Sequence, residues 1–121
     1  MELVAVNPAG RQIIERYAAN GFRVSGEVYR GPVLVFPDRT VLWEEAALTA
    51  ESLAPVVSHG GIELLLLGVG RRVVPVEASL RAWLKASGVA LEIMDTGAAC
   101  RTYNVLLAEN RRVAAALLPP V

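Results

Sequence analysis

The chain has 121 residues, of which 54% are hydrophobic, and its 12 basic and 12 acidic side chains give a formal net charge of zero. This length suits one domain with one core, and the composition is too apolar for intrinsic disorder. A neutral chain offers no electrostatic reason to expect nucleic acid or an anionic lipid surface as a partner. We therefore expect a single domain over residues 1–121, in which residues 1–11 form a loose N-terminal segment.

The first third of the chain predicts short antiparallel strands separated by turns. A first strand is expected over Gln12–Tyr17, two short strands over Phe22–Val24 and Glu27–Tyr29, and a hairpin that joins Val33–Phe36 to Val41–Trp43. The turn residues explain this interpretation. Gly26 can adopt a positive φ, and Pro37 followed by Asp38 favours a turn between two β-branched runs.

After Trp43 the pattern changes to alternating helices and strands, which predicts parallel strands covered by helices. A first helix ends near Ser58, and either Thr49 or Ser52 can cap its start. We favour Ser52, because Pro55 lacks an N–H and fits the first turn of a helix better than its middle.

Five more elements complete the predicted order. The apolar run Ile62–Leu67, closed by Gly68, is typical of a strand buried on both faces. Pro75 opens a helix whose apolar residues recur at helical spacing and which Gly88 ends in the left-handed region. The last three elements are a strand over Val89–Met94, a helix over Gly97–Ala108 capped by Asp95 or Thr96, and a strand over Arg112–Leu118. Without a repeat or linker, the antiparallel start and the α/β remainder are expected to share one sheet system.

Two loops follow the carboxyl ends of predicted parallel strands, which is where ligands bind in open α/β sheets. The first, Gly68-Val69-Gly70-Arg71-Arg72, resembles half of a dinucleotide-binding fingerprint. The third glycine of that fingerprint would stand at Val73, so the pattern is incomplete. We interpret the glycines as residues that turn the chain and the two arginines as a solvated strand end.

The second loop, Asp95–Asn104, places an acid, a thiol, a guanidinium and an amide at one helix N-terminus. A thiol there lies near the positive end of the helix dipole, which favours the reactive thiolate of Cys100. The alternative is that Cys100 is a small apolar residue that lets the helix approach the sheet closely. We favour packing, because nucleophilic cysteines normally need a neighbouring base and His59 lies on another element. Asp95 is interpreted as a helix cap.

The cysteine and histidine counts exclude several classes of site. With one cysteine, Cys100, and one histidine, His59, the chain can form neither an internal disulfide nor a zinc site built from these two residue types. We expect His59 to be an exposed residue at a helix end. The sequence therefore predicts no catalytic apparatus, no metal and no cofactor.

The distribution of apolar residues bears on location. The longest apolar run, Leu64–Leu67 with its neighbours, is far shorter than the roughly 20 residues that cross a bilayer. The N-terminus carries no basic region of the kind that opens a signal peptide. We therefore expect a cytoplasmic protein without membrane insertion.

Four segments of the chain together resemble one known family. They are Gly21–Gly26, Leu64–Gly70, Met94–Asn104 and Arg111–Pro119. The family is the DUF498 type, typified by a small methanogen protein, and it includes the mitochondrial complex I assembly factor three and the adipogenesis-associated protein of vertebrates. The similarity runs from about Gln12 to Pro120, and the pattern Asp-Thr-x-x-Ala-Cys-x-Thr-Tyr-Asn that begins at Asp95 is specific.

The resemblance implies a three-layer α/β fold with a mixed central sheet and a role in binding protein partners. The chain differs from the usual family pattern at Val69, where threonine is usual, and at Asn110, where glycine is usual. We therefore predict a non-enzymatic, assembly-factor-like domain with a protein partner, and a homodimer is compatible with the apolar content. The alternative is a small-molecule or redox site that uses Cys100 and Arg101. Its candidate pocket consists of Gly68, Gly70, Arg71, Asp95, Thr96, Cys100, Arg101 and Asn104.

Overall fold

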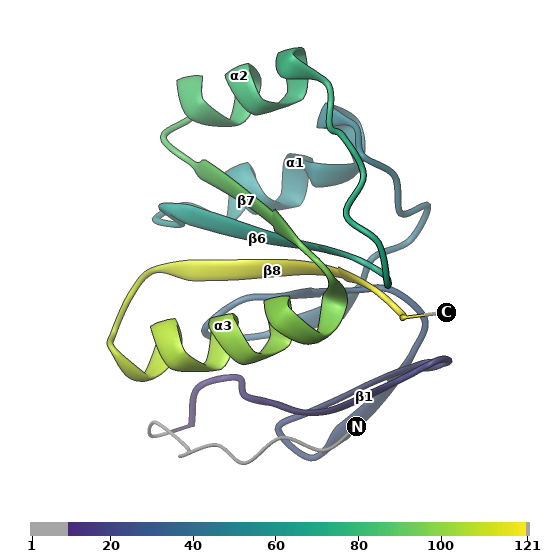
Figure 1. Cartoon of the computed structure of the whole chain (residues 1–121). Coiled ribbons are helices and arrows are strands. Elements are labelled where there is room, and N and C mark those ends of the chain that lie inside the picture. The colour runs from purple at the N-terminus through teal and green to yellow at the C-terminus, as the bar shows by residue number, and fades with distance from the viewer. Residues whose placement is uncertain (1–9, 121) are drawn as a thin grey trace.

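Eight strands and three helices make up residues 10–120, the part of the chain that the computed structural model describes (Figure 1). The strands are β1 (Ile14–Ala18), β2 (Gly21–Val24), β3 (Glu27–Arg30), β4 (Val33–Val35), β5 (Thr40–Leu42), β6 (Leu64–Val69), β7 (Ala90–Met94) and β8 (Val113–Leu118). The helices are α1 (Ala50–His59), α2 (Ala78–Ala86) and α3 (Thr96–Ala108). Most of the predicted loose segment, residues 1–11, lies outside the described residues.

A five-stranded mixed sheet forms the centre of the fold, with the strand order β5-β4-β8-β6-β7. The strands β6, β7 and β8 are parallel, and β4 is antiparallel to both β5 and β8. Leu65, Leu66 and Leu67 of β6 are all buried, as expected for a strand that is covered on both faces. The predicted fold class, α/β with a mixed central sheet, is confirmed.

The first three strands form a second, antiparallel sheet in the order β1-β2-β3. The expectation that all strands share one sheet system is therefore wrong. Gly31, with a φ of 120°, redirects the chain after β3, and Pro32 has no N–H with which to extend a ladder. Only β4 and β5 of the antiparallel start join the central sheet.

Three layers enclose two apolar cores (Figure 1). Helices α1 and α2 cover one face of the central sheet, to which Leu65 and Leu67 contribute. Helix α3 and the inner face of the β1–β3 sheet cover the other face, to which Leu66 contributes. Successive side chains of a strand alternate between its faces, so one run of leucines serves both cores.

Helix α1 is capped by Thr49, whose Oγ1 accepts a hydrogen bond of 3.1 Å from the N–H of Ser52. The predicted start at Ser52 is therefore wrong. The Ser52 hydroxyl has another role, because it accepts hydrogen bonds from Trp43 Nε1 at 2.6 Å and from the N–H of Ala47 at 3.1 Å. Pro55 consequently lies inside the helix, where it cannot donate a backbone hydrogen bond.

Helices α2 and α3 are each followed by a residue with a positive φ, which ends the helix. Helix α2 begins at Ala78, later than the predicted start at Pro75, but Gly88 follows its C-terminus with a φ of 83° as predicted. Asn110 follows α3 with a φ of 61°. Asparagine tolerates this left-handed conformation better than most non-glycine residues. The turn after α3 can therefore form with Asn110, although the family that the sequence resembles usually has glycine at this position.

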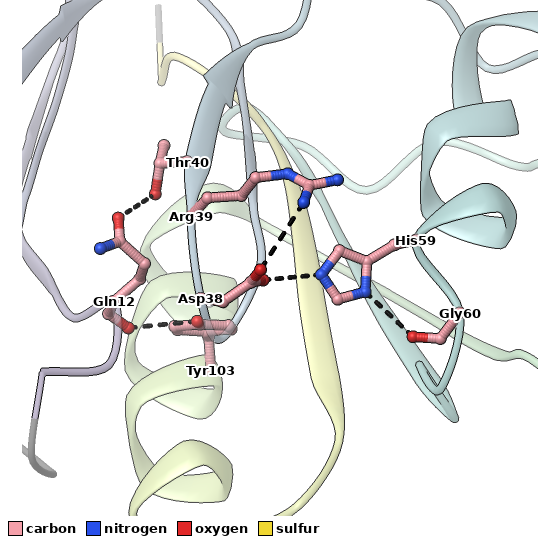
Figure 2. A network of polar contacts seen from close by, with 7 residues as sticks. All are labelled: Gln12, Asp38, Arg39, Thr40, His59, Gly60 and Tyr103. Atoms are coloured by element: carbon pink, nitrogen blue, oxygen red, sulfur yellow. Dashed lines mark hydrogen bonds and ion pairs between the residues drawn. The ribbon is translucent and has the colours of Figure 1, made fainter.

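The turn between β4 and β5 is held against the end of α1 by His59 (Figure 2). The imidazole stacks on Phe36 with the ring centroids 4.5 Å apart. Its Nε2 lies 2.6 Å from Asp38 Oδ1, and its Nδ1 lies 3.0 Å from the carbonyl oxygen of Gly60. Both ring nitrogens therefore lie within hydrogen-bonding distance of oxygen atoms of this chain. The His59 side chain is 15% exposed, so the expectation of an exposed residue is wrong.

Gln12 holds the same turn from its other side (Figure 2). Thr40 Oγ1 donates a hydrogen bond of 2.7 Å to Gln12 Oε1, and the N–H of Gln12 donates one of 2.9 Å to the carbonyl of Pro37. The hydroxyl of Tyr103 in α3 donates to the carbonyl of Gln12 at 3.1 Å. Residues from both covering layers therefore fix the β4–β5 turn.

The pair of Asp38 and His59 predicts a pH dependence of stability. The hydrogen bond with His59 holds the pKa of Asp38 below its ordinary value. A carboxyl whose pKa is lowered on folding stabilises the fold above its unfolded pKa and loses this contribution as the pH falls through the folded pKa. We expect Asp38→Asn to lower the free energy of unfolding at about pH 6, and this loss to shrink between about pH 4 and pH 2.

Urea unfolding at each pH measures this difference. In a His59→Gln background, Asp38→Asn should change the free energy of unfolding little at any of these pH values, because the imidazole is the main cause of the lowered Asp38 pKa. An effect of Asp38→Asn that is the same at every pH in the otherwise unchanged chain would contradict the prediction.

Candidate functional site

Thr96, the first residue of α3, joins the ends of two strands of the central sheet. Its hydroxyl donates a hydrogen bond of 2.6 Å to the carbonyl of Leu118 in β8 and accepts one of 2.8 Å from the N–H of Gly70, just after β6. The N–H of Thr96 donates to the carbonyl of Gly70 at 2.8 Å. Because the side chain is fully buried, these bonds satisfy backbone groups that water does not reach.

Gly68 in β6 allows α3 to approach the central sheet closely. A Cβ atom at this position would lie 2.9 Å from Leu117 Cδ2 and 3.1 Å from both Ala99 Cβ and Thr96 Cα. Contacts this short would require the helix or a neighbouring strand to move. Gly68 is therefore a packing residue, and the prediction that it only turns the chain is incomplete.

Asp95 and Cys100 both have structural roles in α3. Asp95 Oδ1 accepts a hydrogen bond of 2.9 Å from the N–H of Ala98, as predicted for a helix cap. Cys100 is fully buried in the core between α3 and the two sheets. Burial raises the pKa of the Cys100 thiol to about 12, although the Arg101 guanidinium partly opposes this shift. The thiol is therefore neutral at physiological pH and does not reach solvent.

Asn104 and Arg101 connect α3 to β1. Asn104 Oδ1 accepts a hydrogen bond of 3.0 Å from the N–H of Ile14, and Asn104 Nδ2 donates one of 2.8 Å to the carbonyl of the same residue. The side-chain amide therefore pairs with Ile14 as a neighbouring strand would. Arg101 is exposed, and its Nη1 donates to the Tyr17 hydroxyl at 3.4 Å. That hydroxyl covers Gly97, where a Cβ atom would lie 2.7 Å from it.

The eight residues of the candidate pocket lie in different environments. Gly70 and Arg71 line a surface groove of about 520 Å³, whose other residues are Val69, Arg72, Val74, Leu118 and Pro119. Gly68, Thr96 and Cys100 are buried. The other three, Asp95, Arg101 and Asn104, make the contacts described above. No pattern in the sequence links Tyr17 to Gly97, because their contact depends on how β1 docks against α3.

Two further observations concern possible chemistry. Among residues 10–120, no group of three or more His, Cys, Asp or Glu side chains could hold a metal ion, and no helix is long and apolar enough to span a bilayer. His59 and Asp38 resemble a catalytic dyad in their spacing, but both nitrogens of the imidazole are already engaged by this chain.

Comparison with known proteins places the chain in a family. The family described as "Protein of unknown function (DUF498/DUF598)" matches residues 14–118. The chain belongs to this family. The match covers every strand and helix that the structure describes, from β1 to β8. The resemblance that the sequence motifs indicated is confirmed.

Two DUF498 relatives show how far the similarity extends. The chain is 37% identical over 112 residues to NADH dehydrogenase (ubiquinone) 1 alpha subcomplex assembly factor 3 of Xenopus tropicalis, covering 88% of this chain and 61% of that protein. It is 40% identical over 115 residues to an uncharacterised protein of Rhodobacter capsulatus, covering 92% of this chain and 87% of that protein. The chain thus spans less than two thirds of the Xenopus relative.

A solved structure of a related domain supports the same architecture. The solution structure of a Bordetella pertussis protein, described as a Mth938-like domain, superposes with a TM-score of 0.81 at 27% sequence identity. The superposition covers 99% of this chain and 93% of that chain. The α/β fold of the present chain is therefore Mth938-like.

The bridging role of Thr96 predicts a large effect of removing its hydroxyl. Thr96→Val is expected to lower the free energy of unfolding by about 2 to 4 kcal/mol, because the N–H of Gly70 and the carbonyl of Leu118 lose their partner. Thr96→Ser keeps the hydroxyl and loses one buried methyl group, which should cost about 1 kcal/mol. Urea unfolding measures both variants. Equal losses for the two would show that the hydroxyl does not join the strand ends.

The burial of Cys100 predicts an unreactive thiol. Alkylation by iodoacetamide at about pH 8 should be at least about a hundredfold slower for the folded chain than for the urea-unfolded chain, because the thiolate is the reacting species. Cys100→Ala gives the background labelling. Rapid labelling of the folded chain, with an apparent pKa near or below the free value of about 8.5, would instead favour the redox site predicted as the alternative.

Proposed function

We propose that this chain is a non-enzymatic protein-binding domain that helps to assemble a respiratory or other membrane-bound complex from the cytoplasmic side. The observation that carries this proposal is the similarity to complex I assembly factor 3, which extends over 112 residues of the domain. Similarity of fold does not establish function, so the proposal also requires a surface on which a partner can bind.

The polar residues of Asp95–Asn104 support a binding role over a catalytic one. Asp95, Thr96 and Asn104 direct their polar side-chain atoms to backbone groups of this chain, and Tyr103 does the same with its hydroxyl. A catalytic group has to contact the substrate in the transition state. Because these contacts occupy the segment, the outer surface is the more suitable place for a partner.

The surface that we assign to partner binding is the groove beside β8 together with the segment after β6. Val73 is 59% exposed and Val74 is 42% exposed. Arg71 and Arg72 precede them and are also exposed. Adjacent exposed apolar side chains often mark interaction sites, and arginine is enriched at such sites. A partner segment with an apolar side chain for the groove and a carboxylate for the arginines fits this combination.

Two other predictions are separate from this proposal. The small-molecule or redox alternative at Cys100 and Arg101 is tested by the alkylation experiment. Sedimentation equilibrium of the purified chain measures whether it forms the predicted homodimer. Neither result changes the surface assigned to a protein partner.

The proposal predicts that the valines after β6 are needed for partner recovery. A tagged full-length chain is cross-linked in its native cells, and the proteins recovered with it are quantified by mass spectrometry. Val73→Ser combined with Val74→Ser should reduce recovery of a subunit or assembly protein of a membrane complex about tenfold, because two buried apolar contacts are lost at the interface. Their high exposure in the free chain means that folding should be unaffected.

Val105→Ser is the matched control, because Val105 in α3 is 57% exposed but is not among the residues that line the groove. This variant should recover the partner as well as the unchanged chain does. A chain that is consistently recovered alone would contradict the proposed function. Equal loss in the control and in the double variant would contradict the assigned surface.

A further inference from the structure

The outward face of the β1–β3 sheet carries three arginines, one from each strand. Arg16 in β1 lies opposite Arg23 in β2, and Arg23 lies opposite Val28 in β3. Arg30 is two residues further along β3 than Val28, so it shares the same face. Phe22, on the other face of β2, belongs to the core. The three arginines therefore form an oblique row on the side of the sheet that points away from the core; we call this surface the arginine face.

The row is electrostatically unfavourable in the isolated chain. Like charges directly opposite each other on neighbouring strands destabilise a sheet, and Arg16 and Arg23 form such a pair. Of the carboxylates among residues 10–120, only Glu15 lies within ion-pair distance of the row, 3.4 Å from Arg23 Nε. The chain has no net charge, so this local excess of arginine does not follow from a basic composition.

A hollow of about 270 Å³ lies among these arginines. Ala18 and Gly21, which lie opposite each other in the register, also line it, and their small size leaves the space between the longer side chains free. A larger residue does not fit at Gly21, because a Cβ atom would lie 2.0 Å from the carbonyl oxygen of Tyr29. Val28, beside the hollow, is 64% exposed, the highest value among the large exposed hydrophobic side chains of the described residues.

We infer that the arginine face is a docking site for an acidic segment of a protein partner. Guanidinium groups bind carboxylates through paired, charge-assisted hydrogen bonds, which would also remove the repulsion within the row. The exposed Val28 fits an apolar side chain between acidic residues, and a sugar-phosphate backbone has no such group to offer. This inference rests on the proposed protein-binding function and adds a second contact surface to it.

The arginine face and the groove beside β8 lie at the same end of the molecule. Tyr17, near the end of β1, contacts Gly97 at the start of α3. The neighbouring Thr96 bonds to Gly70 at the end of β6. In Figure 1 the ends of β1 and β6 accordingly point to the same side of the molecule. One partner can therefore contact both surfaces.

An NMR titration of the ¹⁵N-labelled full chain tests the inference. The probe is a blocked peptide of alternating glutamate and leucine. The peptide should shift the amides of Arg16, Arg23, Val28 and Arg30 most, and added salt should weaken its binding. A short oligothymidylate is the phosphate probe. Shifts spread evenly over the surface, no shifts at all, or tighter binding of the oligothymidylate at this face would each overturn the inference.

A pair of charge-matched variants separates the arginine face from a general charge effect. Arg16→Gln combined with Arg30→Gln should weaken peptide binding about tenfold. Arg111→Gln combined with Arg112→Gln removes the same charge from two exposed arginines that pair with Glu63, and should weaken it less than about twofold. Equal weakening by the two variants would mean that only net charge matters and would overturn the inference.

The stability of the Arg16→Gln variant distinguishes a binding role of Arg16 from a structural one. Arg16→Gln removes one member of a like-charge pair, so the urea concentration at the midpoint of unfolding should rise slightly. A lower midpoint would show that Arg16 stabilises the sheet itself, which would overturn the inference that its charge serves a partner.

Partner recovery from cells distinguishes failure of this inference from failure of the proposed function. The inference is supported if the unchanged chain recovers a partner, the Arg16→Gln and Arg30→Gln variant loses it, and the control variant with Arg111→Gln and Arg112→Gln keeps it. If both variants retain it, the inference fails and the proposed function stands. If the unchanged chain recovers no partner, the proposed function fails, and with it the inference that rests on it.

Discussion

The close approach of α3 to the central sheet is the constraint on which the rest of the structure depends. Gly68 has no side chain at the point of contact, and Thr96 bonds there to Gly70 and Leu118. A helix this close to a sheet excludes water from its first turn, so its polar groups must find partners within the chain. That requirement explains why so many polar residues are concentrated between Asp95 and Asn104.

The same helix also holds the second sheet in place. Asn104 pairs with the backbone of Ile14 at the start of β1, and Tyr103 donates to the carbonyl of Gln12 just before it. Gln12 then fixes the β4–β5 turn, which His59 fixes from the opposite layer (Figure 2). The small sheet is therefore not a loose hairpin extension. Its inner face completes the core, and its outer face is held in a fixed position.

Because Thr96, Tyr103 and Asn104 of α3 bond to backbone groups of this chain, the groups available to a partner lie elsewhere on the outside of the molecule. Charges are unevenly distributed there, although the net charge is zero. The arginine face carries one arginine from each of β1, β2 and β3, whereas Glu44, Glu45 and Glu51 line a groove beside β5. A neutral composition is therefore compatible with distinct basic and acidic surfaces, and only their placement decides which partner each surface can attract.

The sequence by itself determined the type and order of most elements, because those depend on residues close together in the chain. Gly88 ends a helix and Asp95 caps one through bonds within a few residues, and both roles were predictable. The division into two sheets and the partners of Asn104 and His59 depend on residues far apart in the chain. A thiol or an amide in a helix has the same sequence pattern whether it faces solvent or a core. Only the packing of α3 against both sheets decided that Cys100 is buried, since burial is a property of the assembled layers and not of the helix.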